Sequence, residues 1–439
     1  MEKHIKVRDW KLVAGRWRRR VTKFGGMMIL AWFAGQTLQA QTLEDYVELA
    51  LENNPELKAY DQDYQAALEM ETQAGTLPDP ELSAGIFPRP MDRLMGRQHA
   101  DLQLMQPFPW FGTLSTQKEA ANQQALATFQ GFREAKNQLI YQVKSSWYQL
   151  YRQKEEIRIT EAHTAILRRL ERLALVRYQS EGSTANPSPG FDGMSGVLRL
   201  KMEINELENN LANLNHSQEA LIEAFNHLLN RDPGEQVSLP DTLQATALTW
   251  GSQENPENIT RENPRLKQLE AAESAMQYQK ELQVLKGKPM MGAGISYMPF
   301  SPRTENGMRM GGRDMVMPMV KISLPIFRKK YKALEQESEY REEAIRQRRE
   351  NTSNQLLSEW SQTLNDWENA ERSAALYQQQ INLANQTLEL LTNKYATNGQ
   401  DFEALLEIQR TVLDYRFKLV AAIVDLHLLE AQLENLAGL

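Results

Sequence analysis

The chain has 439 residues, 24% of them charged, and a formal net charge of −7. This balance leaves no basic surface for nucleic acid, so that class of partner is excluded. The absence of cysteine also excludes disulfides, thiolate metal sites and a thiol nucleophile.

The first 40 residues have the pattern of an export signal. Basic residues are frequent between Lys3 and Lys23, and a short apolar segment, 26–33, follows them. Leu38-Gln39-Ala40 resembles a small-residue cleavage site, so we expect the mature chain to begin at Gln41. The alternative is an uncleaved anchor, but the apolar segment is shorter than the ~20 residues that a spanning helix needs.

Long helices are predicted for most of the remaining chain. In chain order, the expected helices cover 43–52, 55–75, 113–181, 197–232, 264–287, 326–398 and 400–436. The segment 326–398 contains no glycine or proline, and a helix of that length spans roughly 100 Å. Such a helix cannot bury itself in one compact core, so we expect it to pack against the other long helices.

Several landmarks occur twice at a nearly constant spacing of roughly 210 residues. Asn54-Pro55 and Asn263-Pro264 each open a helix. Pro109 and Pro325 each precede a long helix, and Tyr178 and Tyr395 each lie near its end. We therefore predict a signal peptide over 1–40 and two tandem helix, β-hairpin, helix repeats over 41–240 and 241–439.

Each predicted repeat contains two segments in which apolar and polar residues alternate. These segments are 81–86 and 101–105 in the first half, and 292–298 and 315–324 in the second. Period-two alternation predicts strands, hence one hairpin in each half. The same pattern is typical of outer-membrane barrels, to which several subunits would have to contribute. The alternative is a soluble antiparallel sheet on a helical bundle.

The export signal, the duplicated Asn-Pro helix starts, the paired hairpins and the paired long helices together resemble the TolC-like outer-membrane efflux proteins. The resemblance covers residues 41–439. It implies a fold that is mainly α with a small β part, and a homotrimer. Its 12-stranded β-barrel would lie in outer-membrane lipid and continue as an α-barrel in the periplasm. It further implies a periplasmic adaptor (membrane fusion) protein and an inner-membrane RND-type efflux pump as partners.

The resemblance also implies a periplasmic entrance where each long helix turns into the next. The matching residues are Tyr178, Tyr395, Asp401, Glu403 and Glu407. The family's best-known member has an arginine shortly after its turn glycine, and here Asp401 occupies that region with a spacing that differs by one. Asp401 is well placed to favour a helix N-terminus. For Glu403 and Glu407 the alternative is an ordinary solvated helix face.

Two further features of the turns bear on the entrance. Gly399 is a suitable helix stop. The first turn carries an insertion, 186–191, that is either a mobile loop or a contact for the adaptor.

Methionine is concentrated between Met290 and Met319. By the predicted alternation, four methionines share the polar strand face with Ser296 and Lys321, and they are Met298, Met315, Met317 and Met319. That face is the expected lumen, and thioethers are soft ligands that select Cu(I) and, by the same softness, Ag(I). The alternative is that methionine serves as flexible apolar filler. The sequence most resembles the heavy-metal branch of the family, the outer-membrane partners of copper/silver and cobalt/zinc/cadmium pumps.

The sequence contains no motif for nucleophilic, metal-dependent or nucleotide-dependent catalysis, so we expect neither an enzyme nor a cofactor. The leading hypothesis is an exit channel of a tripartite efflux system that passively conducts heavy-metal cations. The alternatives are a duct for drugs or for one-step protein secretion, and a non-pore periplasmic coiled-coil scaffold.

Overall fold

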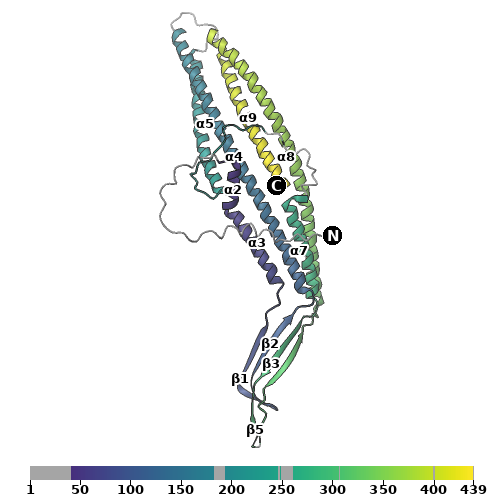
Figure 1. Ribbon diagram of the computed structural model, residues 1–439. Coiled ribbons are helices and arrows are strands. Elements are labelled where there is room, and N and C mark those ends of the chain that lie inside the picture. Colours follow the sequence, from purple (N-terminus) through teal and green to yellow (C-terminus); the bar gives the residue numbers. More distant parts are fainter. Residues whose placement is uncertain are drawn as a thin grey trace, which may run out of the picture. The chain divides into compact units, whose positions relative to one another are not determined.

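The computed structural model describes residues 41–181, 193–245, 248, 261–305, 307–398 and 401–438 (Figure 1). The predictions for the signal peptide, the insertion 186–191 and Gly399 therefore lie outside the described residues. The compact unit Thr42–Leu439 consists of long helices joined to one small sheet.

A helix, two main strands and two long helices follow one another in both halves of this unit, and among the described residues the first half has α2 in addition. The first half contains α2 (Leu43–Asn53), α3 (Pro55–Ala74), β1 (Glu81–Arg93), β2 (Gly96–Phe108), α4 (Thr113–Glu181) and α5 (Gly193–Leu228). The second contains α7 (Pro264–Lys286), β3 (Met291–Met298), β7 (Met315–Ile322), α8 (Arg328–Asn398) and α9 (Phe402–Ala437). The predicted helices are confirmed, with ends that differ by a few residues. The division at residue 240 stays a prediction.

Asparagine caps explain where α3 and α7 begin. The side-chain oxygens of Asn54 and Asn263 accept first-turn backbone N–H groups at 3.1 and 2.9 Å, and proline follows each cap. The two amide groups also donate, Asn54 to the Leu228 carbonyl at 3.1 Å and Asn263 to the Leu436 carbonyl at 2.9 Å. Each cap thereby ties the start of a short helix to the end of the last helix in its half.

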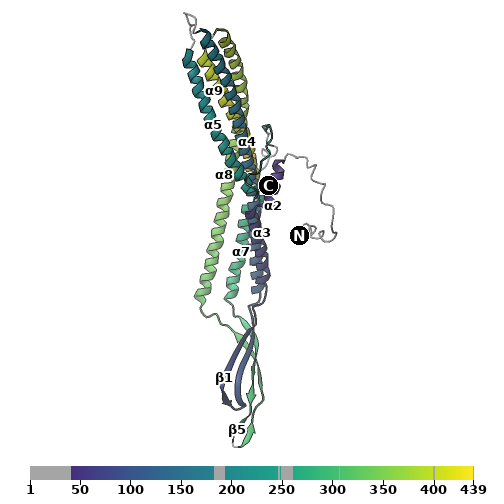
Figure 2. The ribbon, with the colours of Figure 1, turned by 90° about the vertical axis from the view of Figure 1, so that its left-hand side faces the viewer.

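The helices pack through several small apolar clusters. One cluster joins α2, α4 and α5 around the buried rings of Tyr46 and Phe225, whose centroids are 5.2 Å apart. Another joins α7, α8 and α9 around Trp360. Figure 1 shows that α4 and α8 both begin beside the sheet and run away from it, and Figure 2 shows the same course for α8 from a second side. In the described part of the chain, no helix has both the length and the apolar content needed to cross a bilayer.

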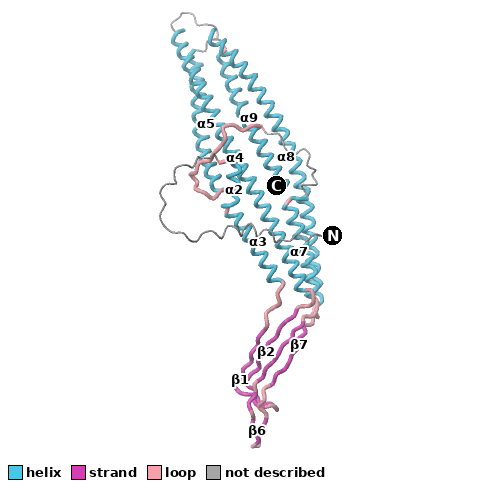
Figure 3. The backbone as a smooth tube through the Cα atoms, viewed as in Figure 1, coloured by secondary structure: helices cyan, strands magenta, loops and turns pink. Residues whose placement is uncertain are grey.

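The two predicted hairpins join into one antiparallel sheet in the order β1-β2-β3-β7 (Figure 3). Strands β1 and β2 extend beyond the predicted segments. Pro88 and Pro90 interrupt the alternation in β1, where the pairing shifts between Ile86 and Met91. Proline is tolerated there because β1 is an edge strand. Short strands that the sequence did not predict lie between β3 and β7: β4 (Phe300–Ser301), β5 (Arg303–Glu305) and β6 (Met308–Met310).

Candidate functional site

The sheet has two chemically different faces. Strand pairing aligns Met298 with Met315 and Ser296 with Met317, and it aligns Gly294 with Met319. The four methionines predicted to share a face therefore do so, and all four are half-buried. On the opposite face the apolar side chains are open, with Val320 and Ile86 78% exposed and Leu82 72% exposed.

Polar groups accompany the methionines on this face. The Ser296 hydroxyl, fully buried, donates to Asp101 Oδ1 at 2.8 Å, and Gln103 Nε2 donates to Asp101 Oδ2 at 3.1 Å. Met105 lies opposite Gly294 and belongs to the same face. Sequence reasoning placed Asp101 and Met105 on the polar side of their strand but did not include them in the candidate site. We call this surface, with the four methionines, Met105, Asp101, Gln103 and Ser296, the methionine face.

The methionine face offers soft sulfur donors together with the carboxylate of Asp101, and the strand register places Glu81 opposite Met105 on the same face. Among the described residues, no group of three or more histidine, aspartate or glutamate side chains is arranged to hold a metal ion. A resident site for a hard or borderline cation would use such groups. Thioether sulfurs are the most numerous donor groups among the residues that define the methionine face.

The second candidate site is the turn between α8 and α9. Tyr395 is 6% exposed, and its ring lies 5.2 Å from that of Phe402. Arg177, near the end of α4, stacks over the Tyr395 ring at 5.5 Å and donates to the Tyr395 carbonyl at 2.6 Å. We call Arg177, Tyr395 and Phe402 the turn clasp, because they connect the end of α4 to the α8–α9 turn.

Ion pairs surround the turn clasp. Glu403 pairs with Arg199 of α5 at 3.0 Å, and Asp401 pairs with Lys394. Asp401 is the N-cap of α9, but its side chain makes no capping hydrogen bond because its backbone is left-handed, with φ of 67°. Asp401 thus stands at the α9 N-terminus, and its carboxylate pairs with Lys394 instead of capping the helix.

The remaining predicted entrance residues lie apart from the clasp. Tyr178 is 36% exposed, and its neighbour Arg177 makes the contact with Tyr395. Glu407 is exposed on α9. The sequence reasoning missed Arg177 and Arg199, because each meets a partner more than two hundred residues away.

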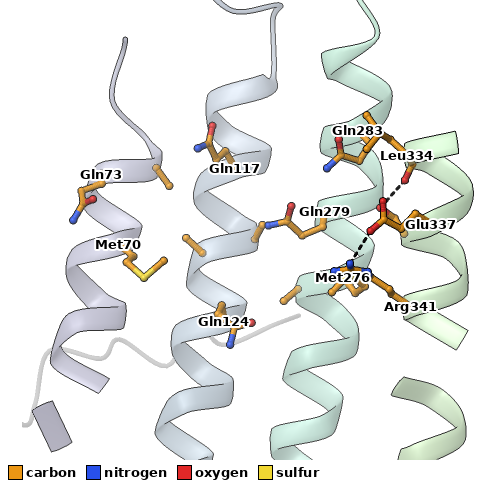
Figure 4. Close-up of a pocket in the computed structure, with 15 residues that line it drawn as sticks. Met70, Gln73, Gln117, Gln124, Met276, Gln279, Gln283, Leu334, Glu337 and Arg341 are labelled. Atoms are coloured by element: carbon orange, nitrogen blue, oxygen red, sulfur yellow. Dashed lines mark hydrogen bonds and ion pairs between the residues drawn. The ribbon is translucent and has the colours of Figure 1, made fainter. Parts of the chain in front are cut away.

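A third feature is a cavity of about 550 Å³ between α3, α4, α7 and α8 (Figure 4). Amide side chains dominate its polar lining: Gln73, Gln117, Gln124, Gln279 and Gln283. Of its described lining residues only Glu337 and Arg341 are charged, and they pair with each other at 2.7 Å. The polar lining of the cavity therefore consists mostly of neutral amide groups with one ion pair.

Comparisons with known proteins identify the class of fold. No protein-family model matches the chain, and no curated protein does. Solved structures do match along almost the whole chain, and outer-membrane channel proteins are among them. The structure of CusC, from a study of folding and transmembrane channel formation, matches with a TM-score of 0.76 and 15% identity, covering 91% of this chain and 92% of that one.

Two further structures agree. The outer-membrane channel OprN matches with a TM-score of 0.73 and 16% identity over 90% of this chain and 89% of its own. The outer membrane protein VceC from Vibrio cholerae matches with a TM-score of 0.73 and 16% identity over 90% of this chain and 96% of its own. The chain thus has the fold of outer-membrane channel proteins.

Proposed function

We propose that this chain is the outer-membrane exit channel of a tripartite efflux system and acts as a homotrimer. The observation that supports this most is the sheet, whose apolar face is open and whose outer strands, β1 and β7, each pair on one side only within the described residues. Antiparallel sheets in water normally cover such a face. Three copies joined edge to edge would form a 12-stranded barrel with this face toward lipid.

The helices support the second part of the proposal. Helices α4 and α8 begin beside the sheet, and their partners α5 and α9 return along them, so three copies would extend the barrel as a helical duct in the periplasm. The proposed partners are a periplasmic adaptor and an inner-membrane RND-type pump. The turn clasp with its ion pairs, Tyr178 and Glu407 would form the entrance, held shut by the contacts of Arg177 and Arg199. The proposal includes no enzymatic step and no cofactor.

The proposed cargo is a soft heavy-metal cation. On the methionine face, the thioethers of Met298, Met315, Met317 and Met319 would make transient contacts without trapping the ion. The alternative substrates, drugs or a secreted protein, would leave these methionines as packing groups. A non-pore periplasmic scaffold, the alternative of a different class, predicts a protein that is extracted without detergent.

The matched contacts of Asn54 and Asn263 support the proposed tandem repeats over 41–240 and 241–439. Both asparagines cap a short helix and both bind the carbonyl near the end of the last helix in their half. This duplicated contact is the physical counterpart of the duplicated sequence pattern.

The test is metal tolerance in cells that lack this protein. The strain would be titrated with copper, silver, zinc, cobalt and cadmium salts and with a panel of lipophilic drugs. It would be complemented with the wild type, with M298L/M315L/M317L/M319L, or with the control M70L/M194L/M202L/M276L, whose substitutions lie on helices. Copper or silver sensitivity that only the strand variant fails to rescue supports the soft-cation channel.

Three results would count against parts of the proposal. Equal rescue by all variants would remove the role of the methionines. Sensitivity to drugs alone would contradict the proposed heavy-metal substrate and leave the proposed channel standing. Extraction of the protein without detergent, together with no conductance in planar bilayers, would remove the channel itself.

A further inference from the structure

The four linkers between helices and sheet meet at one level of the molecule (Figure 3). Together with the ends of the strands and helices that flank them, they cover residues 77–81, 108–112, 286–291 and 322–332, which we call the junction collar. Hydrogen bonds hold neighbouring linkers together: Gln106 Nε2 donates to the Pro78 carbonyl at 2.8 Å, and the Ser323 N–H donates to the Met290 carbonyl at 2.8 Å. Phe108, Met291 and Ile322 align across three strands at this level.

The collar contains an apolar groove of about 630 Å³. Its large lining side chains are Leu77, Phe108, Trp110, Phe111, Met291 and Val320. Because Phe108, Met291 and Val320 also belong to the open apolar face of the sheet, the groove continues that face toward the helices. Phe111 is 76% exposed, and Phe327, in the corresponding linker of the second half, is 75% exposed.

Basic side chains crowd the second-half part of the collar. Six of them are exposed there, and they are Lys286, Lys288, Arg328, Lys329, Lys330 and Lys332. The end of α7 and the start of α8 are close together, since a Cβ added at Gly287 would lie 3.5 Å from Tyr331 Cβ. Among the described residues none of the six forms an ion pair, so no carboxylate there offsets their mutual repulsion. Lys330 lies over the Tyr331 ring, 5.7 Å from its centroid. The acidic residues of the collar are Asp79 and Glu81.

The first half shows that this junction can be built without such charges. Its linker, Trp110-Phe111-Gly112, leads into α4 with no basic residue before Lys118, and Lys118 pairs with Glu71 at 3.7 Å. The basic residues of the second half therefore do not serve the turn from strand to helix. They point to an anionic partner outside the chain.

Given the membrane insertion proposed above, on which this inference rests, we propose that the junction collar binds anionic phospholipids. The phosphate-bearing headgroups would lie on the basic residues, and an acyl chain would lie in the groove beside Trp110. Amphipathic aromatic rings favour the level of the headgroups, and lysine and arginine near an anionic lipid surface are attracted to it. One structure thus supplies both the apolar and the charged part of a lipid site.

Trp110 makes the inference measurable in the purified full-length protein. It would be reconstituted in vesicles with equal fractions of phosphatidylglycerol and phosphatidylcholine, only one of which carries brominated chains that quench tryptophan. The Trp110 signal is the difference between wild type and W110F. We expect the brominated anionic lipid to quench Trp110 more strongly, with an enrichment of about fivefold, the factor that one basic residue contributes near an anionic surface.

Removal of the positive charges of the junction collar tests whether they cause the preference for anionic lipid. In R328Q/K329Q/K330Q/K332Q, which retains Lys286 and Lys288, the lipid preference should fall clearly below that of the wild type. K136Q/R169Q/R348Q/R372Q removes the same charge from exposed helical positions and should keep the preference. If the collar variant does not fold, the salt dependence of the wild type replaces it. Raising the ionic strength to ~1 M shortens the screening length to ~3 Å and should abolish the preference.

Vesicle flotation and planar-bilayer conductance test the proposed channel function independently of the lipid site. Equal quenching by both lipids in a wild-type protein that floats and conducts would overturn the lipid site and leave the channel standing. The same equal quenching, with a collar variant that dissociates into single chains, would assign the basic residues to the contact between copies and also overturn it. A protein that floats with neither lipid would overturn both proposals.

Discussion

The side-chain amide of Asn263 donates a 2.9 Å hydrogen bond to the backbone carbonyl of Leu436, 173 residues away in the sequence. The same side chain caps α7 through its oxygen, so one residue serves the start of one helix and the end of another. Asn54 makes the equivalent pair of contacts, with Leu228 as its distant acceptor.

Substitution of these caps separates their two roles. N263D keeps the capping oxygen but replaces the donor with an acceptor that faces the Leu436 carbonyl, and N263A loses both contacts. Because Asn263 is 1% exposed, we expect N263A to lower the free energy of unfolding by about 2–3 kcal/mol, the sum of a lost cap and an unsatisfied buried carbonyl. Thermal unfolding in detergent measures the change. N54S, which retains a capping oxygen at the less buried site, should unfold closer to the wild type, and equal midpoints for all variants would contradict the dual role.

The contact between Arg177 and Tyr395 is the one that should break when the proposed entrance opens. R177A removes a charged hydrogen bond to the Tyr395 carbonyl and the stacking over its ring. A charged hydrogen bond contributes about 1.5–3 kcal/mol, so the population of an open turn should rise roughly tenfold or more. Single-channel recording in planar bilayers would show this as a larger open fraction.

Arg168 provides a matched control for that experiment. It pairs with Glu208 of α5 at 2.5 Å and does not reach across to α8. R168A should leave the open fraction near that of the wild type. A rise of the same size in both variants would mean that the clasp is not what holds the turn closed.

Gly294 permits the close approach of β2 and β3. A Cβ added there would lie 2.5 Å from the Leu104 carbonyl oxygen and 2.9 Å from Met105 Cε. G294A should therefore shift the strands and reduce the yield of inserted protein, at a cost of about 1–3 kcal/mol for overpacking. At Gly85, in the same sheet, an added Cβ would make only ordinary contacts at 3.8 Å or more.

The two glycine variants are compared by vesicle flotation after refolding. G85A should insert like the wild type. M105A/G294A should not recover fully, because the closer clash is with backbone. Full recovery in the double variant would show that Met105 alone requires the glycine.

His163 is expected to make the helical unit sensitive to acid. It is 3% exposed, and burial lowers the pKa of its imidazole, outweighing the opposing effect of Glu203, while Arg416 acts in the same direction as burial. A histidine with a lowered pKa in the folded state binds its proton more readily when unfolded. The folded state is therefore not destabilised by His163 above the unfolded pKa of about 6.5. The free energy of unfolding decreases as the pH falls below that value towards the lowered pKa of the folded state. Thermal midpoints measured from pH 7 to pH 5 should fall more steeply for the wild type than for H163Q, and parallel curves would refute the assignment.

Local patterns in the sequence predicted most of the fold. The absence of glycine and proline in 326–398 indicated α8, because helix propagation needs only local consistency. The Asn-Pro pairs indicated two helix starts, and the strict alternation around Ile295 and Met317 indicated the strand faces. Each of these signals depends on residues close in sequence.

Long-range relationships could not be predicted in the same way. Nothing near Arg177 indicates that its guanidinium binds the carbonyl of Tyr395, and nothing near Glu403 indicates Arg199. The left-handed backbone of Asp401 is similarly set by its surroundings, since only packing selects that conformation for a non-glycine residue. The sequence therefore predicted where α8 would turn into α9 but not the side chains that connect these helices to α4 and α5.

The open edges of the sheet have a consequence for how cells must make this protein. Within the described residues, β1 pairs only with β2, and β7 pairs only with β3. A single copy therefore has two edge strands with unpaired backbone N–H and C=O groups, which can pair with a strand of any other chain. In the proposed trimer, the stability of one copy then depends on the concentration of the other copies. A copy with one defective edge strand would still pair through its other edge strand. It would join two intact copies, but the barrel of that trimer could not close. Damage to a β7 edge should therefore be dominant-negative, with one defective gene disabling the products of an intact one.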